Sequence, residues 1–211
     1  MRGPLIFYLA IVSQATPALA ALAARRPLDP ARAYTLAWCG VMLAVDLVGM
    51  ALAWNRVSNL WLSYILAPVS AAFVLWTLSH WQAAEVARLT CRIAIVPTVV
   101  AWGVLTWLVE DVSTFSLAAA PMVKLVCLAA AAFTLVAGSL HERQALLRRD
   151  WFWVSAGMTL YFATSAALEP LGALLLASRP DLVKNAYECH AGLDVVAFLL
   201  IARGMTCPPA R

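Results

Sequence analysis

Apolar residues occupy the chain in long runs that short polar links separate. A run of about 20 apolar residues is long enough for an α-helix to cross the roughly 30 Å hydrocarbon layer of a membrane. The pattern predicts seven such helices, at residues 5–24, 33–54, 58–79, 88–109, 112–140, 151–177 and 182–204. The links are too short to form an extramembrane domain. We therefore expect one domain, residues 1–211, that is an all-α polytopic membrane protein.

The composition supports a lipid bilayer as the surroundings of these helices. Apolar residues make up 64% of the chain and charged residues 12%, and the mean hydropathy is +0.82. Soluble domains are less apolar and about twice as charged. The five cysteines show no CxxC spacing, so the sequence indicates neither a zinc ribbon nor a disulfide framework.

Arginine is distributed unequally between the two sides of the predicted bundle, and Lys and Arg favour the cytoplasmic side of membrane helices. The first, third and fifth links and the tail carry Arg25, Arg26, Arg32, Arg88, Arg92, Arg143, Arg148, Arg149, Arg203 and Arg211. The opposite side carries Arg2, Arg56, Arg179 and Lys184. The sequence therefore predicts the N terminus outside and the C terminus inside.

This bias also accounts for the net charge of +4. The chain has no basic stripe with interleaved aromatic residues and no nucleic-acid-binding motif. We therefore expect no nucleic-acid partner.

Seven helices allow a three-plus-one-plus-three arrangement, in which helices one to three and five to seven are parallel copies. Two features agree with such a duplication. The segments NLWLSY (Asn59 to Tyr64) and NAYECH (Asn185 to His190) both begin a predicted helix on the outer side. Pro17 and Pro121 interrupt the first and fifth predicted helices.

Ionisable residues in four predicted helices lie at a similar depth. An ionisable group inside a membrane costs several kcal/mol unless it is paired or hydrated, so such groups usually face the bundle interior and mark function. A rise of 1.5 Å per residue places all of these residues roughly 9 to 18 Å below the outer surface. They are Asp46, Lys124, Glu169, Glu188, His190 and Asp194. The shared depth predicts a polar pocket that opens outward.

Helical spacing decides which side chains share this pocket. His190 and Asp194 are four residues apart and lie on one helix face with Tyr187, whereas Glu188 points about 160° away from His190. Ser70 and Gln14 lie at the depth of the pocket and are able to add hydrogen bonds. The predicted binding residues are Asp46, Lys124, Glu169, His190, Asp194, Tyr187 and Ser70.

The leading functional hypothesis is a binding or sensing protein, a receptor for a small ligand, ion or proton. The chain has no soluble domain of its own, so a signal would pass to a cytoplasmic partner, and the basic link HERQALLRRD (141–150) is the expected contact. A second hypothesis is a small secondary transporter, because prolines at 17, 68, 97, 121 and 170 could break its helices.

A third hypothesis is an intramembrane metal-dependent hydrolase. The seven-helix ceramidase and adiponectin-receptor-like group has an HxxxH pair on its last helix, and this chain has HxxxD at His190 and Asp194. His80 and His141 lie at the opposite side of the membrane, so a three-histidine zinc site cannot form. A divalent ion would have to use the candidates His190, Asp194, Asp46 and Glu169.

The lysines and the remaining histidines bear on two other cofactors, retinal and haem. Retinal is not expected, because microbial rhodopsins carry the lysine that binds it midway along the seventh helix. Here Lys124 is on another predicted helix, and Lys184 lies at the outer rim of the seventh. A haem held between His80 and His141 at the inner face is conceivable, although helix-end histidines are more often interfacial.

Three segments resemble a group of small bacterial seven-helix proteins. They are SNLWLSYILAPVSAAF, DWFWVSAGMTLYF and ECHAGLDVV. The chain departs from that pattern at Ser70, where an acidic residue is expected after Pro68, and at Lys124. The resemblance implies a seven-helix fold in a bacterial cytoplasmic membrane and little about activity.

Overall fold

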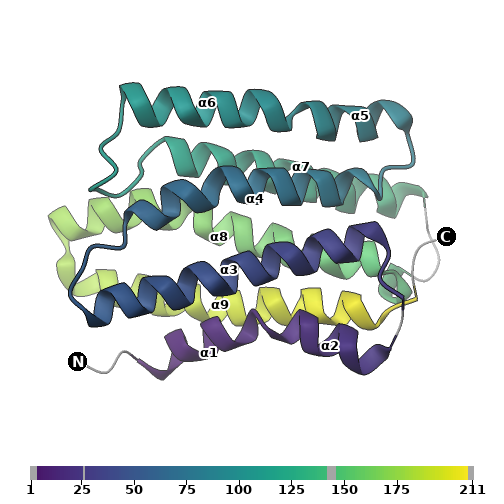
Figure 1. Cartoon of the computed structure of the whole chain (residues 1–211), viewed down its shortest axis with the longest axis horizontal. Coiled ribbons are helices and arrows are strands. Elements are labelled where there is room, and N and C mark those ends of the chain that lie inside the picture. Colours follow the sequence, from purple (N-terminus) through teal and green to yellow (C-terminus); the bar gives the residue numbers. More distant parts are fainter. Residues whose placement is uncertain (1–3, 26, 142–145, 209–211) are drawn as a thin grey trace.

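The computed structural model describes residues 4–25, 27–141 and 146–208, and in this part of the chain it has helices and no strands. The helices lie side by side along one long axis (Figure 1). They are α1 (Leu5–Ser13), α2 (Thr16–Ala24), α3 (Pro30–Trp54), α4 (Trp61–Ser79), α5 (Glu85–Ile93), α6 (Ile95–Leu108), α7 (Ala119–His141), the 3-10 turn η1 (Leu146–Arg148), α8 (Asp150–Ser178) and α9 (Pro180–Thr206).

Six helical segments of the described chain are long and apolar enough to cross a membrane. A seventh span results only if α1 and α2 are one broken span, because they meet at an angle of 41°. The range 5–24 is therefore not one straight helix, which agrees with the expected interruption at Pro17: the break falls at Gln14 and Ala15. Pro17 has no N–H to donate to the carbonyl of Ser13, and the Thr16 hydroxyl donates to that carbonyl instead, at 2.6 Å.

The other prolines have different effects on their helices. Helices α5 and α6 meet at Ala94, three residues before Pro97, whose ring would clash with the carbonyl four residues earlier. Pro68 and Pro170 lie inside the continuous helices α4 and α8. Pro121 lies in the first turn of α7, where the missing N–H has no intrahelical partner to lose. The expected interruption at Pro121 is therefore absent.

Helix α7 begins at Ala119, seven residues later than the predicted range 112–140. The side chain of Glu110 defines this start, because its Oε1 accepts hydrogen bonds from the backbone N–H groups of residues 117–119 at 2.7, 2.6 and 3.2 Å. The Ser116 hydroxyl donates to Glu110 Oε2 at 2.9 Å. These acceptors satisfy N–H groups that have no partner within the helix.

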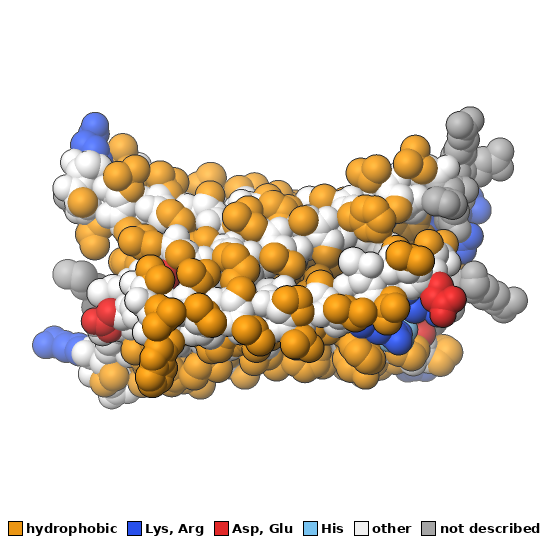
Figure 2. Space-filling view, turned by 90° about the horizontal axis from the view of Figure 1, so that it is seen from above, with side chains coloured by type: hydrophobic (Ala, Val, Ile, Leu, Met, Phe, Trp, Pro, Cys, Tyr) orange, Lys and Arg blue, Asp and Glu red, His pale blue; other side chains and the backbone are white. Residues whose placement is uncertain are grey.

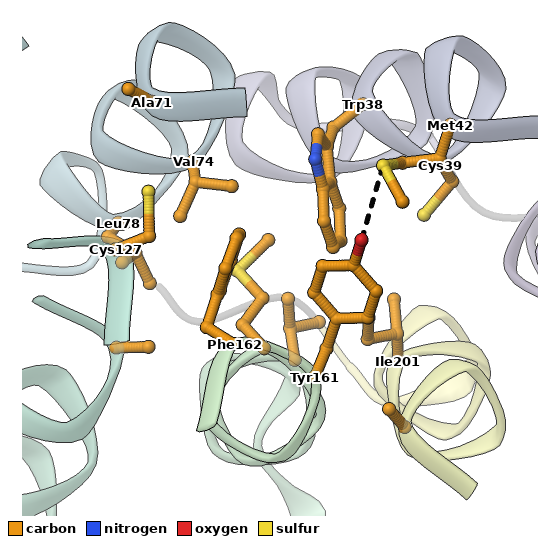
Figure 3. Close-up of a cluster of buried hydrophobic side chains, with 14 of the residues drawn as sticks. Trp38, Cys39, Met42, Ala71, Val74, Leu78, Cys127, Tyr161, Phe162 and Ile201 are labelled. Atoms are coloured by element: carbon orange, nitrogen blue, oxygen red, sulfur yellow. Dashed lines mark hydrogen bonds between the residues drawn. The ribbon is translucent and has the colours of Figure 1, made fainter. Parts of the chain in front are cut away.

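The helices surround a core formed by α3, α4, α7, α8 and α9. Helix α8 packs between α7 and α9, α4 lies between α3 and α7, and α1 and α2 lie along α9. Trp38, which is fully buried, lies at the centre of this core (Figure 3). Its ring stacks on Phe162 and Phe198, with centroids 5.7 and 6.0 Å apart, and meets the edge of Tyr161.

Glycines allow α8 and α9 to approach closely. A Cβ atom on Gly157 would lie 2.6 Å from the carbonyl oxygen of Ala197, and one on Gly204 would lie 2.6 Å from Cγ2 of Val154. Small residues let helix backbones pack tightly inside membranes, where the hydrophobic effect does not drive helices together.

The outer surface matches a bilayer environment. On the face that Figure 2 shows, hydrophobic side chains cover the length of the bundle, whereas charged side chains gather toward its two ends. Trp107, for example, is 87% exposed. The length and apolarity of the helices indicate an integral membrane protein. The orientation of the termini and the three-plus-one-plus-three duplication stay predictions.

Arg32 does not lie in a polar link, as the sequence suggested, but in the first turn of α3, with 1% of its surface exposed. Its guanidinium donates to Asp150 Oδ2 from Nε at 3.2 Å and from Nη2 at 3.1 Å. Nη2 also donates to the carbonyl of Cys207 at 2.7 Å. Asp150 is fully buried at the start of α8. This ion pair joins α3, α8 and the end of α9.

Candidate binding cavity

A cavity of about 650 Å³ lies in the half of the bundle where α1 begins. Its wall is built from α1, α3, α4, α7, α8 and α9, and it reaches the end of the bundle at Trp54, Asn59 and Leu60. Every residue that the sequence proposed for binding lines it, namely Asp46, Ser70, Lys124, Glu169, Tyr187, His190 and Asp194. The structure thus brings these residues together around one cavity, and their role in binding stays a prediction.

Lys124 and Glu169 form an ion pair across the cavity wall. Lys124 Nζ lies 3.0 Å from Glu169 Oε1 and 3.5 Å from the carbonyl oxygen of Ser165, so it links α7 to α8. The depth of Lys124 was overestimated from the sequence. Because α7 begins at Ala119, Lys124 lies roughly 7.5 Å along the helix instead of 18 Å.

His190 and Asp194 form a second pair on α9. His190 Nε2 lies 3.3 Å from Asp194 Oδ2, the contact that their spacing of four residues allows. His190 Nδ1 and Asp194 Oδ1 have no partner in the described part of the protein. Tyr187, one turn earlier, faces Gly172 of α8, where an added Cβ would come within 3.0 Å of the tyrosine hydroxyl.

Gln14 lies at the break between α1 and α2 and connects this bent pair to α3. Its amide Nε2 donates a hydrogen bond to Asp46 Oδ2. Among the described residues Asp46 makes no ion pair, in contrast to Glu169 and Asp194. Within the described part of the chain, the cavity therefore contains one carboxylate whose only side-chain partner is a neutral amide.

Several buried polar atoms on the cavity wall have no hydrogen-bond partner within the described residues. Gln14 is 4% exposed and Ser165 is 3% exposed, yet each has an unused oxygen. The complete set on the wall is Gln14 Oε1, Ser165 Oγ, Glu169 Oε2, His190 Nδ1 and Asp194 Oδ1. Buried polar atoms in native proteins are nearly always hydrogen-bonded. Their concentration at one cavity indicates that water or another polar molecule pairs with them there.

Sequence reasoning did not find Tyr161, which lines the cavity, or Trp38, which contacts the cavity residue Ser70. Ser70 accepts a hydrogen bond at 3.2 Å from Nε1 of Trp38, so the central tryptophan fixes its position. Tyr161 lines the cavity and donates to the sulfur of Met42 at 3.7 Å, as Figure 3 shows. The available signal was the position of Tyr161 near the middle of the predicted helix 151–177, away from the interfaces where Trp and Tyr are enriched. Trp38 lies five residues into the predicted helix 33–54, so its position gave no such signal.

Glu188 is not part of the cavity wall. Its carboxylate pairs with Lys184 one turn away, at 3.5 Å, near the N-terminal end of α9. This position agrees with the expectation that Glu188 faces away from His190. It makes Glu188 a suitable control for substitutions inside the cavity.

The structure gives no geometric support to a metal site. Within the described residues, no three His, Cys, Asp or Glu side chains gather closely enough to hold a metal ion. The four candidates His190, Asp194, Asp46 and Glu169 are instead divided between separate pairs. The hydrolase hypothesis therefore has no observation in its favour.

The haem hypothesis concerns the opposite end of the bundle. His80 ends α4 and stacks on Tyr34, with ring centroids 6.1 Å apart. Partial burial, and then the positive charge of Arg92, lower the pKa of His80 below its usual value. The side chain of His141 lies outside the described part, so a pairing with His80 is untested.

Models of known protein families, curated proteins and solved structures were compared with the chain, and none of them matches it.

Proposed function

We propose that this chain is an integral membrane protein that binds a small polar ligand in its cavity and reports the bound state to a partner. One observation carries the proposal: five cavity side chains each have a buried polar atom without a partner in the described structure. A ligand that pairs with several of these atoms makes several hydrogen bonds at once, each with a net contribution of about 0.5–1.5 kcal/mol.

The arginine bias supports an orientation for this receptor. With the N terminus outside, the cavity opens toward the outer side and the basic links face the cytoplasm. The link 141–150 is the proposed contact for a cytoplasmic partner, although residues 142–145 lie outside the described part. The resemblance to small bacterial proteins favours the cytoplasmic membrane of a bacterium as the location.

Transport is a second candidate, and the break in the first span favours it. Secondary transporters often build their substrate sites from discontinuous helices. Here the break falls at Gln14, whose amide binds Asp46 in the cavity. A transporter would move its ligand into proteoliposomes, whereas a receptor would bind the same ligand without flux.

A thermal-shift screen tests whether the cavity binds small molecules. The protein in nanodiscs is heated with each member of a library of small water-soluble compounds. At a hundredfold excess over its Kd, a cavity ligand stabilises the folded state by about 2.7 kcal/mol, which raises Tm by about 5–10 °C. We expect such compounds to stabilise the wild type and the Glu188→Gln control.

The Asp194→Asn variant separates cavity binding from binding elsewhere. It keeps the shape of the side chain but removes the charge beside His190, so the same compounds should stabilise it less. Compounds that stabilise all three proteins equally, or a library without any stabilising compound, would contradict the proposal.

A further inference from the structure

We propose that the ligand of this cavity is a small organic cation, an amine with an apolar body, whose ammonium group lies between Asp46 and Asp194. This inference rests on the proposed function and names its ligand class. It is supported by the charges of the cavity, by the hydrogen-bonding character of its unused atoms and by its apolar wall.

Negative groups outnumber positive ones on the described wall of the cavity. Asp46, Glu169 and Asp194 face one lysine, Lys124, and one histidine, His190. Even with His190 protonated, one carboxylate has no positive counterpart. The pairing identifies it as Asp46, because Lys124 is paired with Glu169 and His190 with Asp194. A cationic ligand would supply the missing charge.

Asp46 and Asp194 line the same cavity, Asp46 from α3 and Asp194 from α9. Two ionised carboxylates that face one cavity of low dielectric constant repel one another, and a cation between them reduces the repulsion. Lys124 does not serve this role because Glu169 and the Ser165 carbonyl hold its ammonium group.

The unused polar atoms are suited to a donor. Three of these atoms are acceptors and not donors: the amide oxygen Gln14 Oε1, and Glu169 Oε2 and Asp194 Oδ1 when their carboxylates are ionised. The fourth, Ser165 Oγ, accepts as well as donates. His190 Nδ1 is also an acceptor when Nε2 carries the proton toward Asp194. A primary ammonium group has three donors and no acceptor, so it complements this set. Gln14 and Ser165 are more than nine-tenths buried, so the surrounding protein holds both side chains in place.

The remaining wall selects an organic cation over a metal ion. Apolar and aromatic side chains supply much of the lining, including Phe7, Tyr8, Met42, Met50, Tyr161 and Phe162. A cavity of about 650 Å³ falls in the range of small-molecule sites. No three metal-ligating side chains come together among the described residues. The geometry therefore fits an ammonium head beside the carboxylates and an apolar body against the methionines and aromatic rings.

Three probes of similar size and different charge test this inference. The cation 2-phenylethylamine, the neutral 2-phenylethanol and the anion 3-phenylpropanoate are titrated at pH 7 against the protein in nanodiscs by isothermal calorimetry. A charge-assisted hydrogen bond in a desolvated site is roughly twice as strong as a neutral one, so we expect the amine to bind at least about tenfold more tightly than the alcohol. We expect no saturable binding of the anion.

The Asp46→Asn variant tests the role of the unpaired carboxylate. We expect it to weaken binding of the amine about tenfold while the affinity for the alcohol changes less than about twofold. The Glu188→Gln variant, which removes a charge outside the cavity on α9, should bind all three probes as the wild type does. The comparison of the three probes on the wild type decides the question even if Asp46→Asn fails to fold.

The outcomes separate this inference from the proposed function. If the alcohol or the acid binds as tightly as the amine or more tightly, the inference of a cationic ligand is wrong, whereas the proposed function as a small-molecule receptor stands. Failure of the amine to bind, while the thermal screen finds other cavity ligands, would also overturn only the cation. If no probe binds and the screen finds nothing, both proposals fall.

Discussion

Replacement of Asp150 by leucine is expected to lower the free energy of unfolding by about 3–5 kcal/mol. Asp150 and Arg32 are both almost completely buried, and Asp150 Oδ2 accepts two hydrogen bonds from the guanidinium. The substitution leaves that guanidinium buried with the Cys207 carbonyl and a contact of 3.5 Å to Asp29. The loss is measured as a shift of the unfolding midpoint when SDS is titrated into detergent-solubilised protein.

Two further variants show whether the loss comes from the unpaired charge. The double variant Arg32→Met and Asp150→Leu removes both charges and should recover at least half of the lost stability, because apolar residues often replace a buried ion pair at little cost. The Asp181→Asn variant breaks the exposed pair with Arg179 and should cost less than about 1 kcal/mol. A single-variant loss no larger than that of Asp181→Asn would contradict the buried pair.

Replacement of Lys124 by methionine is expected to lower the free energy of unfolding by about 2–3 kcal/mol, less than at Asp150 because water in the cavity screens the charge left behind. Lys124 holds Glu169 at 3.0 Å, and both side chains are mostly buried. The double variant Lys124→Met and Glu169→Gln should recover at least half of the loss. Stability is followed in the same SDS titration.

Lys184→Met is the matched control for this pair. Lys184 contacts Glu188 at 3.5 Å, but its side chain is 70% exposed, so its loss should cost less than about 1 kcal/mol. Equal losses for Lys124→Met and Lys184→Met would show that the Lys124 pair has the strength of a surface contact and is not part of a buried cavity.

The apolar pattern predicted the helical fold because long apolar runs have few alternatives in a bilayer. It predicted helix ends less well. The start of α7 depends on the carboxylate of Glu110, which caps the helix from a preceding loop, and hydropathy does not detect such a cap. The break at Gln14 and Ala15, by contrast, lies just before Pro17, the proline that was expected from the sequence to interrupt this helix.

The rise of 1.5 Å per residue gave the depth of each ionisable residue from the outer end of its predicted helix. Residues at equal depth below the same side of the bundle lie level with one another, so this estimate selected residues that line one cavity. The pairing of Lys124 with Glu169 was open, since depth does not say which helices are neighbours. Arg32 was misplaced for a related reason. An arginine beside an apolar run is usually an interfacial residue, and its partner Asp150 is 118 positions away in the sequence.

We infer that a polar, water-accessible cavity enters the bundle from the end where α1 begins. Thiol accessibility tests it most directly, in a Cys189→Ser background, because Cys189 is the one exposed cysteine of the chain. Ser70→Cys places a thiol on the cavity wall, and Ala71→Cys places one in the core on the next residue. We predict that 2-aminoethyl methanethiosulfonate modifies Ser70→Cys at least tenfold faster than Ala71→Cys, as followed by intact mass. Equal, slow modification of both variants would contradict the cavity.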